Sequence, residues 1–168
     1  MCLRLSGFQS GHASAILDWP RDALEMSAWA GVDAPFPATA DLFDRWHADP
    51  DVQPLLLFDG RDLVGYAEIW MDRVDREIEL GRVIVAPPRR VRGVGRQFVR
   101  LLLDRAATFG FEDVFARVVP ENRAAIRCYE AAGFDRVPAG DEQRYNRGQP
   151  RSYVWMRYCL NAPHNGIA

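Results

Sequence analysis

The sequence predicts a single mixed α/β domain with a central, mostly antiparallel sheet that contains one parallel strand pair. Apolar residues alternate with period two over 55–58, 63–71 and 77–85, and Asp59-Gly60 is a hairpin signal. A long amphipathic segment then leads to another strand, 113–119, which is the order of a β–α–β unit with parallel strands. No repeat, linker or low-complexity segment divides the chain. We therefore expect one domain over residues 1–160.

The N-terminal third predicts a short strand followed by short helices. Trp19-Pro20 and Asp49-Pro50 interrupt the helical patterns, and Thr39 is a good N-cap for a helix that carries Leu42, Phe43 and Trp46. The expected elements are a strand at Leu3 and Leu5, a turn and helix within 7–17, a helix over 21–30 closed by Gly31, a loop over 32–38, and the Thr39-capped helix.

The strand over 77–85 contains a change of phase. Ile78 and Leu80 occupy even positions, whereas Val83 and Val85 occupy odd ones, so a regular pleat cannot keep both pairs on one face. Gly81-Arg82 lies where the phase changes, and glycine inside a strand often marks a β-bulge. We expect a bulge there; the alternative is a strand end buried on both faces.

The C-terminal half continues with alternating helices and strands. Phe98, Leu102, Ala106 and Phe109 form one apolar stripe on a helix that Gly110 ends. The expected elements are this helix over 95–109, a strand over 113–119, a helix capped by Asn122 and closed by Gly133, a strand over 134–137, a polar loop over 139–150, a last strand over 153–160, and a flexible tail over 161–168.

Composition excludes several classes of protein. The net charge of −2 argues against a general nucleic-acid binder, and all 21 basic residues are arginine, which excludes any lysine-dependent mechanism. Cys2, Cys128 and Cys159 are scattered, so we expect neither a disulfide framework nor a metal site. The N-terminus has no signal-peptide pattern, and no apolar run approaches membrane-spanning length. We expect a cytoplasmic protein without a membrane partner and leave a homodimer open.

The most informative stretch is Val85 to Gly95, in which three arginines and two glycines separate a strand from a long helix. Unpaired N–H groups at a helix N-terminus, with the helix dipole, favour a phosphate. A dinucleotide fingerprint is excluded because Phe98 stands where its third glycine would be, and a Walker A loop is excluded by the absence of lysine.

Two segments together resemble the GNAT superfamily of N-acetyltransferases. Arg90, Gly93 and Gly95 match the core of its acyl-CoA motif, Q/R-x-x-G-x-G/A. The segment Asn122 to Phe134 resembles its N-x-x-A-x-x-x-Y-x-x-x-G-F signature. The resemblance is strong over residues 62–137 and only topological over the N-terminal third. It implies that the bulged strand and its parallel neighbour splay around acetyl-CoA as the acyl donor, with an amine as the acceptor and no metal.

The resemblance also implies which residues hold the donor. The backbone of the strand end would pair with the pantetheine arm, backbone amides of the loop would cradle the pyrophosphate, and the Asn122 side chain would contact the CoA arm. The implied cofactor residues are Val83, Ile84, Val85, Arg90, Val91, Arg92, Gly93, Val94, Gly95, Arg96, Asn122 and Tyr129.

The implied reaction is direct attack of an amine on the acetyl thioester. Tyr129 matches the family's proton donor to the thiolate, and a backbone N–H near Val85 is available to stabilise the oxyanion. Glu79 is the first choice for general base; Glu77, Glu68 and a water chain stay open. Some relatives carry a glutamate five residues before the asparagine, where this chain has Arg117.

The acceptor is poorly specified by the sequence. In this family it is bound by segments that correspond here to 19–46 and 139–150, and the first of these is rich in aromatic and acidic residues. Small amines, aminoglycoside-like molecules, amino acids and protein N-termini stay open. Cys128 has no nearby histidine in the sequence to activate it as a nucleophile. A non-catalytic acyl-CoA-binding regulatory module is the alternative function.

Overall fold

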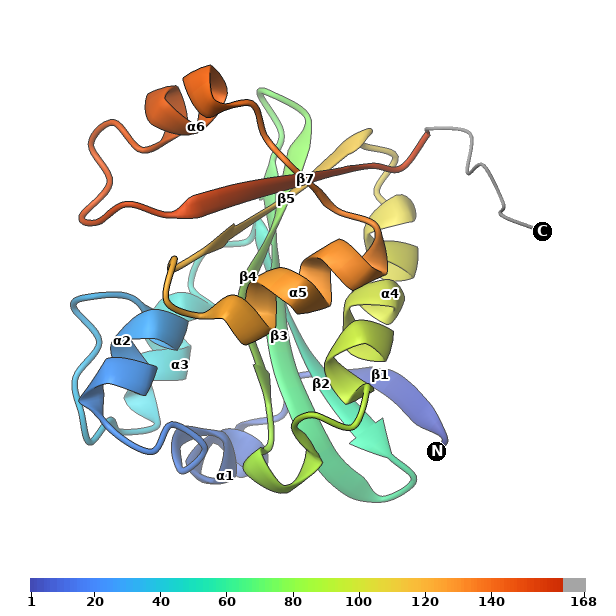
Figure 1. Ribbon diagram of the computed structural model, residues 1–168. Helices are drawn as coiled ribbons and strands as arrows, with labels where there is room; N and C mark the ends of the chain where they lie inside the picture. Colours follow the sequence, from blue (N-terminus) through green and yellow to red (C-terminus); the bar gives the residue numbers. More distant parts are fainter. Residues whose placement is uncertain (162–168) are drawn as a thin grey trace.

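The computed structural model describes residues 1–161, which form one seven-stranded sheet with helices on both faces (Figure 1). The strands lie in the order β1-β2-β3-β4-β5-β7-β6, and all neighbours are antiparallel except β4 and β5. This confirms the predicted fold class. The strands are β1 (Leu3–Gly7), β2 (Val52–Asp59), β3 (Asp62–Asp72), β4 (Glu77–Val85), β5 (Asp113–Val118), β6 (Asp135–Arg136) and β7 (Val154–Cys159).

The helices divide between the two faces of the sheet. On one face lie α4 (Val94–Ala107) and α5 (Arg123–Ala132), whose apolar sides build the larger core. On the other lie a 3-10 turn (Ser10–His12), α1 (Ala13–Leu17), α2 (Ala23–Ala30) and α3 (Asp41–Trp46), which cover a second core. A further 3-10 turn (Pro87–Arg89) precedes α4, and α6 (Ala139–Tyr145) packs beside β7.

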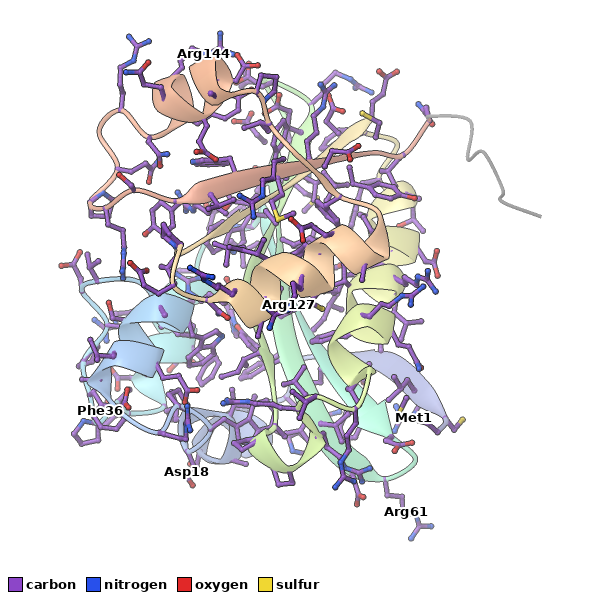
Figure 2. The ribbon with its side chains drawn as sticks, in the orientation of Figure 1. Met1, Asp18, Phe36, Arg61, Arg127 and Arg144 are labelled. Atoms are coloured by element: carbon purple, nitrogen blue, oxygen red, sulfur yellow. The ribbon has the colours of Figure 1, made fainter. Side chains whose placement is uncertain are left out.

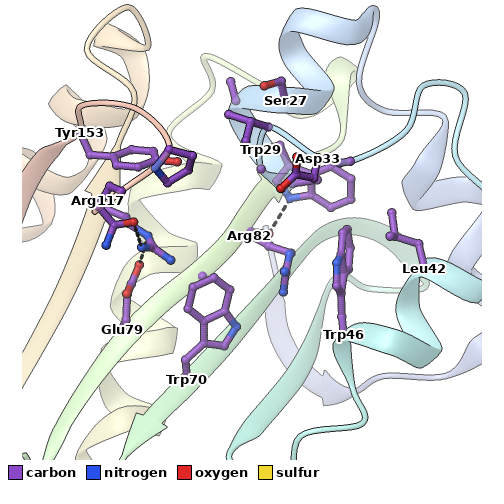
Figure 3. Close-up of a pocket in the computed structure, with 18 of the residues that line it drawn as sticks. Ser27, Trp29, Asp33, Leu42, Trp46, Trp70, Glu79, Arg82, Arg117 and Tyr153 are labelled. Atoms are coloured by element: carbon purple, nitrogen blue, oxygen red, sulfur yellow. Dashed lines mark hydrogen bonds and ion pairs between the residues drawn. The ribbon is translucent and has the colours of Figure 1, made fainter. Parts of the chain in front are cut away.

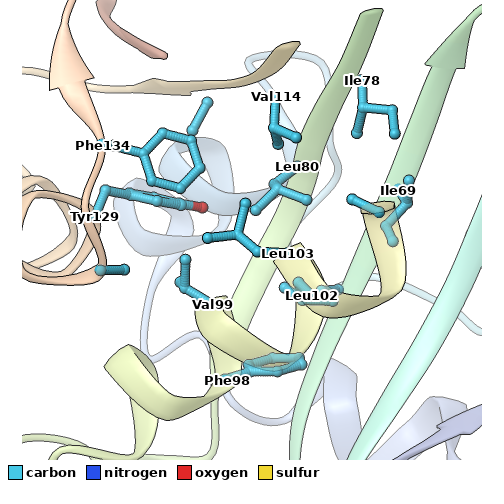
Figure 4. Close-up of a cluster of buried hydrophobic side chains, with 14 of the residues drawn as sticks. Ile69, Ile78, Leu80, Phe98, Val99, Leu102, Leu103, Val114, Tyr129 and Phe134 are labelled. Carbon is cyan, nitrogen blue, oxygen red and sulfur yellow. The ribbon is translucent and has the colours of Figure 1, made fainter. Parts of the chain in front are cut away.

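The larger core fixes α4 and α5 against the sheet (Figure 4). Phe98 and Leu102 of α4 are fully buried, as the predicted stripe requires. Phe98 also fills the space beside Gly65 of β3, where an added Cβ would lie 2.9 Å from the ring. Because this packing leaves α4 little freedom, the N-terminus of the helix is held at one place beside the end of β4.

A β-bulge interrupts β4 at the predicted position. Tyr66 pairs with Ile84 and Glu68 with Gly81, so one extra residue lies on β4 between these pairs. Arg82 takes a left-handed φ of 46°, and its carbonyl accepts a 2.7 Å hydrogen bond from Trp29 Nε1 of α2. The bulge places Leu80 and Val83 on the α4 face together.

Substituting alanine for Gly81 tests how tightly the bulge is packed. An added Cβ would lie 2.3 Å from the Trp70 indole, so we expect Gly81→Ala to lower the free energy of unfolding by about 1–3 kcal/mol in urea denaturation. The control is Gly140→Ala in α6, where a Cβ meets nothing within 4 Å and helix propensity improves. Equal stability of Gly81→Ala and the wild type would contradict this packing.

The parallel pair separates soon after it forms. Pairing between β4 and β5 covers only three residues of each strand and ends at Glu79 and Phe115. Beyond that point β4 stays paired with β3 and β5 with β7, and Figure 1 shows the two diverging. The sheet is therefore split at its centre, between the two helical layers.

Two local expectations are wrong. Residues 139–150 were expected as a polar loop, but residues Ala139–Tyr145 form α6, which has Asp141 and Glu142 in its first turn. Ala40 rather than Thr39 is the N-cap of α3, because the Thr39 hydroxyl bonds the Asp41 carboxylate instead of a backbone N–H. The expected tail lies outside the described residues except for Asn161.

The helices of residues 1–161 include none that is both long and apolar enough to cross a membrane.

Candidate active site

The segment between β4 and α4 has the backbone of an anion-binding loop. Gly93 is the N-cap of α4 with a φ of 76°, and Val91 takes a φ of 54° with its side chain fully exposed. A left-handed conformation is unusual for a β-branched residue, and such strain is concentrated at functional sites. Alternating right- and left-handed residues turn successive N–H groups to one side, which suits a phosphate.

Arginine side chains hold this loop in place. Arg90 donates to the Val85 carbonyl at 2.9 Å, to Glu25 of α2 at 2.7 Å and to the Trp19 carbonyl at 3.2 Å. Arg89 donates to Asp59 at 3.1 Å and Asp62 at 2.8 Å on the β2–β3 hairpin.

The remaining loop positions expected at the cofactor differ in exposure. Arg92 and Arg96 are exposed, Val94 is buried in the core, and Gly95 packs against Cys128. Arg61, Arg127 and Arg144 lie on the outside of the molecule (Figure 2). Arg89 and Arg90 thus stabilise the loop, whereas Arg92 and Arg96 extend from it.

Asn122 and Tyr129 lie on α5, on the same face of the sheet as α4. Asn122 is the exposed N-cap, and its Oδ1 accepts from Ala125 N at 3.1 Å. Tyr129 is buried against Phe134, with ring centroids 5.1 Å apart. Figure 4 shows its hydroxyl directed toward Leu80 of β4. Burial, followed by the Cys128 and Glu79 charges, raises the pKa of Tyr129, so its hydroxyl stays protonated.

Glu79 lies at the last rung of the parallel pair, on the opposite face from Tyr129. Arg117 Nε of β5 lies 2.8 Å from Glu79 Oε1 (Figure 3). This is an ion pair by distance, but within residues 1–161 no donor is directed at Oε1 with hydrogen-bond geometry. Burial raises the pKa of Glu79 to about 7, against the opposing effect of Arg117 and Arg82. The carboxylate is thus able to gain and lose a proton near neutral pH.

The other two candidate bases are placed differently. Glu68 is fully buried and accepts from Tyr66 Oη, Trp70 Nε1 and Arg82 Nη1, so both of its oxygens are occupied. Glu77 lies two residues before Glu79, where β4 is still paired with β5. Burial and then the neighbouring carboxylates raise the pKa of Glu77. Of the three, Glu79 alone borders the cavity described next.

A cavity of about 470 Å³ opens on the α2 face of the split (Figure 3). Its walls come from α2 and the segment after it, α3, the middle of β4, Arg117 of β5 and the 149–153 segment. Trp29, Trp46, Trp70 and Tyr153 supply flat aromatic surfaces. Both segments expected to bind the acceptor, 19–46 and 139–150, contribute residues to these walls.

Sequence reasoning missed the two arginines at the base of this cavity. Arg82 lies between two indoles, 4.0 Å from the Trp46 centroid and 5.0 Å from that of Trp70. Arg117 was noted only as a departure from a family pattern, yet it is the ion-pair partner of Glu79. An arginine next to the glycine of a strand was the available signal for Arg82; Arg117 gave no local signal.

Among residues 1–161, no three His, Cys, Asp or Glu side chains are grouped so as to hold a metal ion. The split sheet has, near one face, a loop whose backbone suits a phosphate and, at a cavity on the other, the largely buried carboxylate of Glu79. This arrangement suits a group-transfer enzyme that joins a phosphate-bearing donor to a second substrate.

Comparison with known proteins identifies the family. Residues 14–134 match the family described as Acetyltransferase (GNAT) family. N-alpha-acetyltransferase RimI of Mycobacterium tuberculosis is 37% identical over 138 residues, which cover 80% of this chain and 81% of that protein. The chain therefore belongs to the GNAT family, and the expectation of an acetyltransferase is confirmed.

Solved structures of this fold agree. Spermidine N-acetyltransferase from Vibrio cholerae, in complex with CoA and spermine, superposes with a TM-score of 0.74 at 22% identity, covering 94% of this chain and 95% of that one. AAC(6')-Ib, in complex with parmomycin and acetyl-CoA, superposes with a TM-score of 0.78 at 17% identity, covering 100% of both chains. These similarities support the fold.

Proposed function

We propose that this chain transfers the acetyl group of acetyl-CoA to a primary α-amine of a peptide or small molecule by direct attack. The observation that carries the proposal is the position of Glu79. It is a largely buried carboxylate with a pKa raised to about 7, at the end of the parallel pairing and at the wall of a cavity. The name of the 37% identical relative, an N-alpha-acetyltransferase, supports an α-amine as acceptor.

The donor binds along the end of β4 and the start of α4 in this proposal. The exposed turn at Val91 and Gly93 offers its amides to the pyrophosphate, and the helix dipole adds to that attraction. Within residues 1–161, no strand pairs with Val83, Ile84 and Val85 on the β5 side. Their backbone is therefore available to the pantetheine arm, apart from the Val85 carbonyl, which accepts from Arg90. Asn122, at the start of α5, contacts the same arm.

Glu79 accepts the proton that the acceptor must lose. An α-amine has a pKa of about 8, so most of it is protonated at neutral pH, and only the neutral amine has a lone pair for attack. Glu79 takes one proton from the ammonium group, and the nitrogen then bonds to the thioester carbonyl carbon. A backbone N–H near Val85 stabilises the oxyanion until the C–S bond breaks. The nitrogen then loses its second proton to the departing thiolate, so that CoA leaves as its thiol, and Glu79 returns the first proton to solvent.

Tyr129 assists the leaving group from the other face of the sheet. Its raised pKa keeps the phenol protonated, so it donates a hydrogen bond to the sulfur as negative charge develops there. Cys128 is not the nucleophile of a covalent route, because burial raises the pKa of its thiol despite the nearby Arg96. Transfer therefore occurs directly between the two substrates.

The proposal is tested with two measurements on the full chain. Acetyl-CoA should raise the melting temperature in proportion to the logarithm of its concentration, since it binds the native state. Thiol release in the presence of an amine panel should then identify an acceptor. A thermal shift without thiol release for any amine would support the alternative function, a non-catalytic acyl-CoA-binding module. The absence of a thermal shift would refute acetyl-CoA as the ligand of this chain.

Substitution of Tyr129 by phenylalanine should lower kcat about 10- to 100-fold, because the leaving thiolate loses its hydrogen-bond donor. Acetyl-CoA affinity should change little, since the ring stays in place against Phe134. Thiol release at saturating substrate measures the effect, with Tyr145→Phe in α6 as the control. An unchanged kcat in Tyr129→Phe would mean that the hydroxyl has no role in the transfer.

A further inference from the structure

The charge around the acceptor cavity is arranged in an unusual way for a site that takes an amine. Three arginines, Arg45, Arg82 and Arg117, line it, together with two carboxylates, Asp33 and Glu79. Arg82 and Arg117 are largely buried and face the cavity (Figure 3). The Arg45 side chain is exposed. The cavity wall is thus more cationic than anionic.

Two of the three carboxylates near these arginines, Glu79 and Glu68, already have another role. Glu79 receives the substrate's proton in the proposed reaction, and once protonated it no longer neutralises Arg117. Glu68 balances Arg82, but it is fully buried behind it and does not line the cavity. Asp33 alone is left to pair with a cationic group of the acceptor. A second ammonium group would therefore meet guanidinium groups at short range, where like charges repel.

The aromatic surfaces hold these cations in place. The Arg82 guanidinium lies between the Trp46 and Trp70 indoles, and Arg117 lies 5.5 Å from both the Trp70 and Tyr153 centroids. Stacking fixes the guanidinium planes at little entropic cost. Arg82 Nη1 donates to Glu68, and Arg117 Nη1 donates to Gln149 at 2.9 Å, so Nη2 of each guanidinium is the nitrogen that would bond a carboxylate. The same indole rings offer an apolar surface to the rest of the acceptor.

We infer that the acceptor is an α-amine that carries a carboxylate close to the amine, and that polycationic amines are excluded. This inference rests on the proposed function and specifies its substrate class. The carboxylate binds at Arg82 and Arg117 while the amine lies at Glu79. Two kinds of molecule have this chemistry: a peptide whose second residue is acidic, and a free amino acid.

The decisive experiment compares acceptors that differ only in charge. Thiol release from acetyl-CoA is measured with the C-terminally amidated tripeptides Ala-Asp-Ala, Ala-Asn-Ala and Ala-Lys-Ala, and with free aspartate and spermidine. We expect kcat/KM to be at least tenfold higher for Ala-Asp-Ala than for Ala-Lys-Ala, with Ala-Asn-Ala between them and spermidine lowest. Raising the salt concentration should shrink the difference. A faster reaction of free aspartate than of Ala-Asp-Ala would assign the free amino acid as the source of the carboxylate.

Variants connect the preference to the arginines. Arg82→Met alone would leave Glu68 buried without its cation, so it is combined with Glu68→Gln. The amide oxygen at the Oε2 position still accepts from Trp70, and the amide NH2 at the Oε1 position donates to the Tyr66 hydroxyl, whose own proton can turn to His47 Nε2. The double variant should reduce the acidic-over-basic ratio at least fivefold. Arg45→Gln, at an exposed position, should reduce it by a smaller factor without a folding cost. The matched control is Arg73→Gln. It breaks the ion pair between Arg73, just after β3, and Asp51, which do not line the cavity, and it should leave the acidic-over-basic ratio of kcat/KM unchanged.

The outcomes separate the two proposals. Equal or higher kcat/KM for Ala-Lys-Ala or spermidine would overturn the carboxylate inference while leaving the acetyltransferase function intact. An unchanged ratio in both Arg82→Met/Glu68→Gln and Arg45→Gln would overturn the role of the arginines. Failure to release thiol with every acceptor, including the neutral peptide and the amine panel, would instead count against the proposed function itself.

Discussion

Replacing Gly93 with glutamate is expected to abolish acetyl-CoA binding. Gly93 is the N-cap of α4 in a left-handed conformation, and a Cβ there meets nothing within 4 Å, so the new side chain would extend into the space in front of the loop. Its carboxylate would occupy and repel the position proposed for the pyrophosphate. An acetyl-CoA titration followed by melting temperature should lose its shift entirely.

The control for this substitution is Gly110→Glu. Gly110 has a similar φ of 74°, also has no neighbour within 4 Å of a Cβ, and follows the opposite end of the same helix. Both variants should lose about 1–2 kcal/mol of stability from the strained backbone, but only Gly93→Glu should lose the ligand. Acetyl-CoA affinity that is unaltered in Gly93→Glu would refute this loop as the pyrophosphate site.

Glu79→Gln is expected to lower kcat/KM by about 100-fold or more, because the amide cannot accept the acceptor's proton. The wild-type rate should rise with pH through about 7, as the carboxyl loses its proton and becomes able to deprotonate the bound ammonium. The variant should lose that rise and instead gain activity as the amine deprotonates in solution near pH 8. A pH–rate profile over pH 5.5–9 with a fixed peptide acceptor measures both effects.

Stability should respond to the same titration in the opposite direction. Burial raises the folded-state pKa of Glu79 above its ordinary value of 4.5, so the folded state favours the protonated form. The stability that this form contributes is fully present below about pH 4.5 and is lost as the pH rises through about 7. Glu79→Gln should remove that part of the pH dependence, which chemical denaturation at several pH values would detect.

Glu77→Gln is the matched control, since Glu77 lies on the same face of β4 but away from the cavity. It should retain both the rate and its pH profile. A Glu79→Gln variant with wild-type kcat/KM would mean that water or another group removes the proton.

Much of the fold followed from local patterns in the sequence. The phases of Ile78 and Val83 located the β-bulge, because a side chain's face is fixed by the pleat and only an extra residue reconciles the two. The Asn122 cap marked a helix N-terminus, since a capping amide has few alternatives. The helix expected from Gly95 begins one residue earlier, at Val94, with Gly93 as its N-cap. These features depend on neighbours within a few residues.

The features that were not predicted depend on distant partners. The helix α6 has no apolar stripe of its own, and Tyr145 is held by Phe115 and Trp155 from other strands. The pairing of Glu79 with Arg117 joins residues that are far apart in the sequence and come together only because β4 and β5 are parallel. The hydrogen bonds of the Arg90 side chain, which join the end of β4 to Glu25 and Trp19, likewise connect residues far apart in the sequence. The expectation that Arg90 lies at the cofactor stays a prediction.

The split between β4 and β5 also divides the work of the chain between two separate sets of residues. The loop proposed to bind the pyrophosphate leads into α4, whereas the cavity is built largely by α2, α3 and the 149–153 segment. A substitution in α2 can therefore reshape the cavity while every residue at the start of α4 keeps its surroundings. Substitutions during evolution can therefore change which acceptor is bound while the binding of the donor is kept.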